Sequence, residues 1–249
     1  MDYPETKGGW IKHPDGPLLG GPDMGTCFDV FALADTDGYR LYFSWRDKDS
    51  LAVVTGTDGI HWSEPRIILE PQPETGWEDK LNRNAVVKRG DIYHMWYCGQ
   101  ARDYTRIGYA TSQDGYTWTR YSDEPIMIPE LPWEGRSLMC PHVLWDEEQG
   151  LFKMWYSAGE TYEPDAIGYA VSADGVHWRK HPANPIFTPG KASWEQDKVT
   201  ACQVFKRDGQ YLMFYIGFED VHTARIGIAR SPDGITRWQR HPENPIVSP

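Results

Sequence analysis

Large and small residues alternate in a segment that recurs along the chain. Residues 167–172, IGYAVS, show the two-residue period of a β-strand whose two faces differ. Asp174 and Gly175 follow, a pair typical of a tight turn, because glycine reaches positive φ without strain and aspartate tolerates it. Trp178 begins a returning strand that ends before Pro185, since proline has no N–H to donate to a sheet. The pattern therefore predicts a β-hairpin.

This hairpin is repeated. Related copies begin at residues 107 and 226, and a more degenerate copy begins at residue 51. The equivalent tryptophans, 60 residues apart, are Trp118, Trp178 and Trp238. Upstream of each copy lies a second hairpin, with a short apolar strand, a polar turn and an aromatic-rich strand. These inner hairpins span residues 28–43, 84–97, 141–156 and 202–215.

Two hairpins give each repeat four antiparallel strands, and aromatic landmarks in such repeats are typical of propeller blades. We predict an all-β protein, a β-propeller of four-stranded antiparallel blades that forms a single domain over residues 1–249. The predicted blades cover residues 25–72, 77–130, 133–190 and 194–249. Residues 10–18, WIKHPDGPL, repeat only a blade's tail. Either four blades close the ring and this N-terminal strand is a strap, or the chain is a piece of a five-bladed ring.

The charge of the chain restricts its partners. A net charge of −11 argues against a nucleic-acid or anionic-membrane surface. The sequence has no apolar run of about 18 residues and no signal-peptide pattern at its start, so we expect a soluble, cytoplasmic protein, secreted if a leader was removed. The sequence leaves the oligomeric state open.

The cysteines do not form a motif. Cys27, Cys98, Cys140 and Cys202 lack CxxC spacing, so buried free thiols are expected rather than a disulfide or a metal site. Cys140 and His142 are two residues apart on a strand, and Cys27 could approach them, but a zinc ion would need a fourth ligand. We predict no cofactor and no metal ligands, while a structural cation in the funnel stays an alternative.

The repeat W-E…GxYxMWYxG…IGYAxSxDGxxW resembles the five-bladed β-propeller glycosidases, a superfamily that holds glycoside hydrolase families 32, 43, 68, 117 and 130. The resemblance implies a central funnel with a base Asp, a charge-stabilising Asp and an acid Glu at the starts of the innermost strands. This sequence departs from that pattern. Met139 stands at the acid position, Arg83 lies where the second Asp is expected, and Cys27 replaces the first Asp, with Asp29 two residues later.

Three residues are candidates for chemistry in the funnel. Strand alternation places Asp29, Ala85, His142 and Gln203 in one register, with Arg83 among the residues two positions earlier. If this side faces the funnel, Asp29 supplies a base, Arg83 a hydroxyl anchor and His142 an acid. Family 117 enzymes use a histidine acid, so the resemblance supports His142. The alternative is that these residues line a wet channel and satisfy one another.

Loop residues form a second set. Glu160 lies closest to a strand end, so we predict it opposite Asp29 as the acid, although charged loop tips are often solvated surface. The repeated W-E element is expected to be structural. Its non-repeated neighbours Asp79 and Arg136 join Arg83 and Gln203 as predicted substrate-binding residues. Trp45 and Tyr104 are predicted to stack against a sugar, or else to form blade contacts.

These observations favour an enzyme that cleaves or rearranges a glycosidic bond of an oligosaccharide. Met139 and Arg83 at acid positions favour a different class, a non-catalytic glycan-binding or scaffold propeller. A glycoside phosphorylase is a third alternative, because Arg83, Arg102 and Arg136 could hold phosphate, unless they belong to an ordinary ion-pair network.

Overall fold

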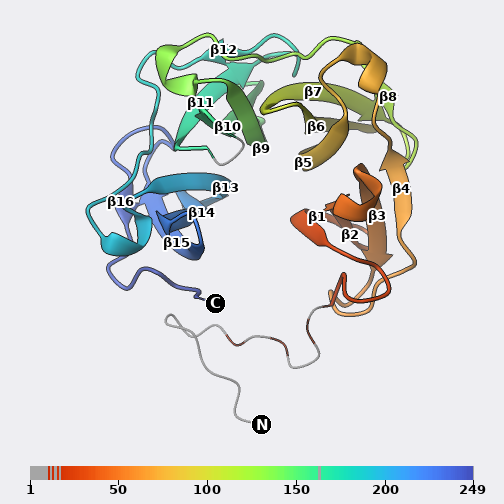
Figure 1. The fold of residues 1–249 in the computed structure, drawn as a ribbon, viewed down its shortest axis with the longest axis horizontal. Helices are drawn as coiled ribbons and strands as arrows, with labels where there is room; N and C mark the ends of the chain where they lie inside the picture. Colours follow the sequence, from red (N-terminus) through yellow and green to blue (C-terminus); the bar gives the residue numbers. More distant parts are fainter. Residues whose placement is uncertain (1–10, 12, 14–15, 17, 162–163, 249) are drawn as a thin grey trace.

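The computed structural model describes residues 11, 13, 16, 18–161 and 164–248. The strands form four antiparallel sheets of four strands each, arranged around one axis (Figure 1). The predicted all-β propeller of four-stranded blades is therefore confirmed. No helix in the described ranges has the length and apolar character that a membrane span requires.

The sequence order of the strands is also their order in each sheet, and the first strand of each blade lies nearest the axis (Figure 1). Blade 1 consists of β1 (Cys27–Asp35), β2 (Gly38–Trp45), β3 (Ser50–Gly56) and β4 (Arg66–Leu69). Blade 2 consists of β5 (Lys80–Arg89), β6 (Ile92–Ala101), β7 (Tyr104–Ser112) and β8 (Thr119–Arg120). Blade 3 consists of β9 (Ser137–Asp146), β10 (Leu151–Gly159), β11 (Ala166–Ser172) and β12 (Arg179–Lys180). Blade 4 consists of β13 (Lys198–Arg207), β14 (Gln210–Asp220), β15 (Thr223–Ser231) and β16 (Gln239–Arg240).

Short 3-10 helices lie in the connections: η1 (Arg46–Lys48), η2 (Pro73–Thr75), η3 (Pro132–Glu134) and η4 (Ser193–Glu195). The strands of the described residues form four sheets, as the four complete repeats predicted, and not the five of the glycosidases that the sequence resembles. The sequence contains only the tail of a further repeat. That tail, residues 10–18, falls largely outside the described residues.

Every innermost strand carries the same β-bulge. One residue per blade adopts a left-handed backbone, namely Asp29, Arg83, Cys140 and Ala201, with φ of 50°, 51°, 52° and 43°. The strand register shifts at each of these points. The bulges make Asp29 equivalent to Arg83, so the predicted register, which matched Asp29 with His142, is wrong. His142 is instead equivalent to Phe31, and the reason is that a bulge re-aims side chains that simple alternation places elsewhere.

The bulge ties neighbouring blades together. The Arg83 backbone N–H donates to Ser44 Oγ of the preceding blade (2.8 Å), and the Ala201 N–H donates to Ser157 Oγ (3.0 Å). Both hydroxyl-bearing residues are fully buried. At a bulge the backbone N–H has no partner in its own sheet, and each of these bonds gives it an acceptor in the neighbouring blade. The same hydrogen bond therefore stabilises both the left-handed residue and the contact between the blades.

Replacing Ser157 by alanine should lower the free energy of unfolding by about 1–3 kcal/mol, because the Ala201 amide then stays buried without an acceptor. Replacement by cysteine should recover part of the loss, since Cys98 occupies the equivalent place in blade 2 and its sulfur accepts the Cys140 N–H. Urea unfolding of the two variants measures the difference. Equal losses in both would show that the hydrogen bond does not contribute.

Blade 4 lies beside the opening of the ring in Figure 1, and one of its apolar side chains is more exposed than the equivalent side chains of blades 2 and 3. Ile226 is 37% exposed, whereas its counterparts Ile107 and Ile167, which make the same bridge to the blade tail, are 0% exposed. The side-chain amide of Gln203 donates to the Val30 carbonyl of blade 1 across this opening (3.1 Å). Apolar side chains that the next blade buries in blades 2 and 3 therefore meet solvent in blade 4.

This difference predicts unequal costs for two matched substitutions. Ile167→Ala should lower the free energy of unfolding by about 2–5 kcal/mol, as for a fully buried isoleucine. Ile226→Ala should lower it by about 1 kcal/mol, because more than a third of that side chain already contacts water. Urea denaturation compares them. Equal costs would mean that the blade 4 face is covered in solution.

Candidate functional site at the centre of the propeller

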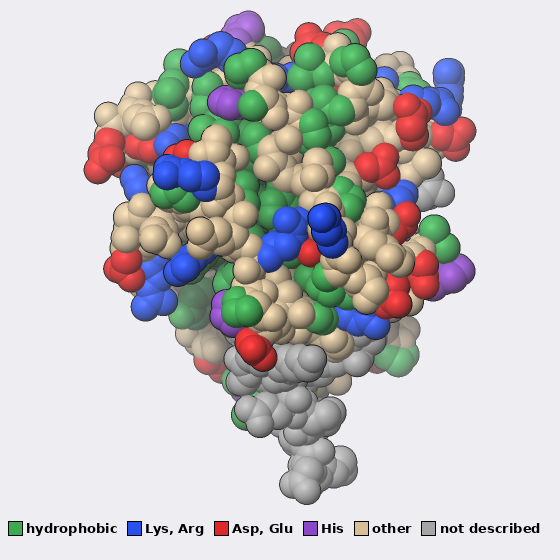
Figure 2. Space-filling model, turned by 90° about the vertical axis from the view of Figure 1, so that its left-hand side faces the viewer, with side chains coloured by type: hydrophobic (Ala, Val, Ile, Leu, Met, Phe, Trp, Pro, Cys, Tyr) green, Lys and Arg blue, Asp and Glu red, His purple; other side chains and the backbone are tan. Residues whose placement is uncertain are grey.

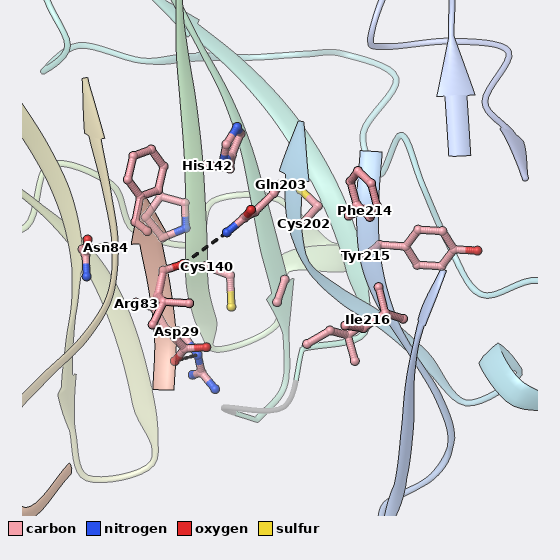
Figure 3. A pocket seen from close by; sticks show the side chains of 15 residues that line it. Asp29, Arg83, Asn84, Cys140, His142, Cys202, Gln203, Phe214, Tyr215 and Ile216 are labelled. Carbon is pink, nitrogen blue, oxygen red and sulfur yellow. Dashed lines mark hydrogen bonds and ion pairs between the residues drawn. The ribbon is translucent and has the colours of Figure 1, made fainter. Parts of the chain in front are cut away.

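A cavity of about 410 Å³ lies where the four innermost strands meet (Figure 3). Each blade contributes its bulge residue to the wall, namely Asp29, Arg83, Cys140 and Ala201. A bulge places its side chain differently from the strand around it, which is how these residues reach the axis. His142 and Gln203, both predicted from the sequence, also line the cavity.

Asp29 and Arg83 form an ion pair in this wall. Arg83 Nε lies 3.3 Å from Asp29 Oδ2, and the two side chains are only 16% and 25% exposed. On its other side Arg83 Nη1 lies 3.2 Å from the sulfur of Met139, the fully buried residue at the expected acid position. A neighbouring guanidinium favours the ionised form of a carboxyl group. The pair therefore suits Asp29 to accept a proton rather than to donate one.

His142 lies at the opposite end of the cavity from Asp29 and Arg83 in Figure 3. Its ring is buried, and Nε2 donates to the Val204 carbonyl (2.9 Å), because a carbonyl can only accept. Burial lowers the pKa of His142 to about 4, so the imidazole is neutral at pH 7. A neutral, buried ring far from Asp29 is poorly placed for the predicted acid role.

The buried imidazole predicts a pH dependence of stability. In the unfolded chain the imidazole of His142 is protonated near pH 6.5, whereas in the folded chain it is protonated only near pH 4. Its contribution to stability is therefore complete above pH 6.5 and is lost as the pH falls below that value. His142 should remove about 2 kcal/mol of unfolding free energy between pH 7 and pH 5. Urea unfolding of the natural chain and of His142→Gln at both pH values measures this. A variant with the same pH slope would contradict the buried neutral state.

Sulfur atoms surround the middle of the site. Met139, Cys140 and Cys98 pack in one buried cluster, and Cys202 lines the cavity. Burial raises the pKa of the Cys98 and Cys202 thiols, so both are protonated at neutral pH and neither is an active nucleophile. Within the described part of the chain, no group of three or more His, Cys, Asp or Glu side chains is arranged to hold a metal ion.

Other predicted residues lie elsewhere. Glu160 is exposed and is not part of the cavity wall, so the structure does not place it opposite Asp29 as predicted. Asp79 and Arg136 are likewise exposed outside the wall. Glu160 directly follows β10, whereas Asp79 and Arg136 directly precede the innermost strands β5 and β9, so all three lie beyond the strand ends and not at the bulges within the innermost strands.

The two predicted aromatic platforms make contacts within their own blades. The Trp45 indole N–H donates to the Met24 carbonyl (2.7 Å). The Tyr104 hydroxyl donates to the Gly76 carbonyl (3.0 Å), and the Arg106 guanidinium lies 4.4 Å above its ring. Neither residue lines the cavity. These contacts correspond to the structural alternative given above for both residues.

Sequence reasoning missed the apolar side of the cavity, which blade 4 supplies through Phe214, Ile216 and Ile226. Their counterparts elsewhere are buried scaffold residues, such as Trp155, which pairs with His142 as Phe214 pairs with Gln203. Comparison of the repeats gives no signal for them, because the equivalent positions of the other blades belong to the core and the difference in exposure is seen only in the structure.

On the outer face drawn in Figure 2, Lys and Arg side chains are interspersed with Asp and Glu, with hydrophobic side chains between them. This face has no extended area of one charge. A polyanion such as nucleic acid would therefore find no continuous basic surface there, in agreement with the net charge of −11.

The sequence profile of the glycosyl hydrolases family 32 N-terminal domain matches residues 34–181, more than half of the chain. The chain belongs to this family. An uncharacterized protein of Mycobacterium tuberculosis is 30% identical to this family 32 chain over 225 residues, which cover 82% of this chain and 72% of the relative. A beta-1,2-mannobiose phosphorylase of Thermoanaerobacter sp. is 25% identical over 174 residues, covering 63% of this chain and 54% of that enzyme.

Solved structures share the fold of this family 32 chain. A thermostable family-43 glycoside hydrolase superposes with a TM-score of 0.72 at 19% identity, covering 89% of this chain and 74% of that one. A family 117 glycoside hydrolase from Zobellia galactanivorans gives a TM-score of 0.67 at 18% identity, covering 96% and 73%. The chain thus has a glycoside hydrolase-like propeller fold, and its relatives include both hydrolases and phosphorylases.

Proposed function

We propose that this chain is an enzyme that acts on the glycosidic bond of an oligosaccharide or glycoside held in the central cavity. The observation that carries the proposal is the Asp29–Arg83 ion pair in the cavity wall of a glycoside hydrolase-like propeller. Phe214 and Ile216 line the other side, and apolar side chains there suit the C–H face of a sugar ring.

Asp29 is assigned the role of general base. It accepts a proton from a water molecule as the water oxygen bonds to the anomeric carbon, and the electron pair of the glycosidic C–O bond leaves with the departing oxygen. Arg83 holds the carboxylate in place and keeps it ionised. Asp29 is the one carboxylate among the described residues of the wall, because Met139 occupies the acid position.

A site that lacks an acid should depend steeply on the leaving group. General acid catalysis contributes about 10²–10⁴-fold, so 4-nitrophenyl glycosides, which leave without protonation, should react at least about 100-fold faster than methyl glycosides. Release of nitrophenol and of methanol across a set of sugars measures the two rates. Similar rates for both would show that a general acid is present and would contradict the assignment.

A non-catalytic glycan-binding propeller is the second candidate. The single carboxylate of the described cavity wall favours it, because cleavage of glycosidic bonds usually uses two. Titration calorimetry with an oligosaccharide panel, together with the activity screen, separates the candidates. Binding with no turnover of any nitrophenyl glycoside would support the binding protein and refute the enzyme.

Phosphorolysis is the third candidate, supported by the similarity to a beta-1,2-mannobiose phosphorylase and a 1,2-beta-oligomannan phosphorylase of Thermoanaerobacter sp.. Phosphate would then replace water as the nucleophile and the product would be a sugar 1-phosphate. The activity screen is therefore run with and without inorganic phosphate. Turnover that requires phosphate would support this candidate, and turnover without it would support hydrolysis.

A further inference from the structure

A second, polar hollow of about 350 Å³ lies beside the central cavity, and Arg83 lines both. Its walls come from the start of blade 2, which supplies Lys80 and Asn82, and from the loop after β2 in blade 1, which supplies Arg46 and Asp49. Their position next to Asp29's partner makes the hollow accessible to a ligand that also occupies the central cavity.

The hollow is cationic in an acidic chain. Arg46, Lys80 and Arg83 line it together with one carboxylate, Asp49. Arg83 also pairs with Asp29 of the central cavity, so the hollow keeps a small positive charge in a chain whose net charge is −11. Lys80 Nζ lies 3.4 Å from Asp49 Oδ1. The Arg46 guanidinium lies over the Phe28 ring, with its carbon 4.6 Å from the ring centre. A guanidinium presents its N–H donors in a planar fork, and a carboxylate matches this fork geometry.

The hollow also holds a buried acceptor. Asn82 is only 6% exposed, and its Nδ2 donates to Gln100 Oε1 (3.1 Å). Its Oδ1 is buried, and no donor from the described residues reaches it. A buried acceptor without a donor is costly, so the site favours a ligand that brings a hydroxyl group.

We propose that this hollow is a subsite for an acidic sugar residue, one that carries a carboxylate and neighbouring hydroxyls as a uronate does. Arg46 and Lys80 bind the carboxylate, and Asn82 Oδ1 accepts a ring hydroxyl. Phosphate fits this set less well, because it is mainly an acceptor at neutral pH and its greater charge meets Asp49. The inference rests on the proposed function, since it names the substrate class of the same site.

Titration calorimetry tests the subsite with uronate-containing oligosaccharides and their carboxyl-reduced, neutral counterparts. The acidic member of each pair should bind about tenfold tighter, as expected for one charge-assisted contact, and the advantage should shrink as salt is added. Arg46→Gln should abolish the advantage. Arg207→Gln is the matched control, because Arg207 lies at the far end of β13 with a 78% exposed side chain, and should keep it.

Equal binding of acidic and neutral sugars would overturn the subsite. A second result would also overturn it: inorganic phosphate binds, Arg46→Gln abolishes that binding, and uronates bind no tighter than neutral sugars. The anion bound by the hollow would then be phosphate. The readout is binding rather than turnover, so failure of the subsite and failure of the proposed function give different results. Tighter binding of uronates without any turnover would support the subsite and refute the enzyme. Turnover of neutral glycosides without tighter binding of uronates would support the enzyme and refute the subsite.

Discussion

Replacing Glu134 by alanine is expected to lower the free energy of unfolding by about 3–5 kcal/mol. Glu134 is fully buried, accepts the Tyr156 hydroxyl (2.7 Å) and pairs with Lys180 (2.8 Å). Burial alone would raise the pKa of Glu134, but hydrogen bonds from the Glu130 N–H, Lys180, Tyr156 and the Leu131 N–H outweigh it and lower the pKa. Removal of the carboxylate takes the acceptor from the buried Tyr156 hydroxyl, and it leaves the mostly buried Lys180 ammonium with the exposed Glu130 carboxylate and the Ile128 carbonyl.

The same chain offers a matched control. Glu130 pairs with the same Lys180 nitrogen at 3.0 Å, but its side chain is 65% exposed. Glu130→Ala should therefore cost less than about 1 kcal/mol, as surface ion pairs do. Urea unfolding at pH 7 compares the two. Equal losses of unfolding free energy in the two variants would mean that Glu134, the glutamate of the W-E element, does not stabilise blade 3.

Replacing Asp29 by asparagine is expected to lower turnover about 10²–10⁴-fold with little change in stability, because an amide cannot accept the proton that the carboxylate takes from water. The two side chains have nearly the same shape, so sugar binding should change far less than the rate. Steady-state kinetics on the best nitrophenyl glycoside, with urea unfolding alongside, measure both effects.

Asp103→Asn serves as the control, because Asp103 is an exposed loop residue outside the cavity wall. Its turnover should equal that of the natural chain. If Asp29→Asn also keeps full activity, Asp29 is not the base, and the catalytic assignment fails even though the fold stands.

The repeats predicted the fold because they are local. Asp174 in its turn accepts the backbone N–H groups of Val176 and His177, and Asp114 and Asp233 repeat the arrangement, so a short motif dictates each hairpin. Four copies of a hairpin pair then leave little choice of architecture.

The site was harder to predict, because tertiary contacts determine it. The four left-handed bulge residues are an Asp, an Arg, a Cys and an Ala, which share no local preference for that conformation. For Arg83, Cys140 and Ala201 the backbone is held by hydrogen bonds to other blades, such as that between Arg83 N and Ser44 Oγ. The sequence indicated Asp29 and Arg83 as candidates. It did not show that they occupy equivalent positions in their blades or that their side chains form an ion pair. Glu160 was misplaced for the same reason, since its position depends on a loop path.

A crystal structure of Asp29→Asn with the oligosaccharide that binds most tightly tests the central claim most directly. We predict a sugar ring in the cavity, with the residue 29 amide and Arg83 within hydrogen-bond distance of its oxygens and Phe214 against its C–H face. A sugar bound on the outer blades, with solvent alone beside residue 29, would contradict the account.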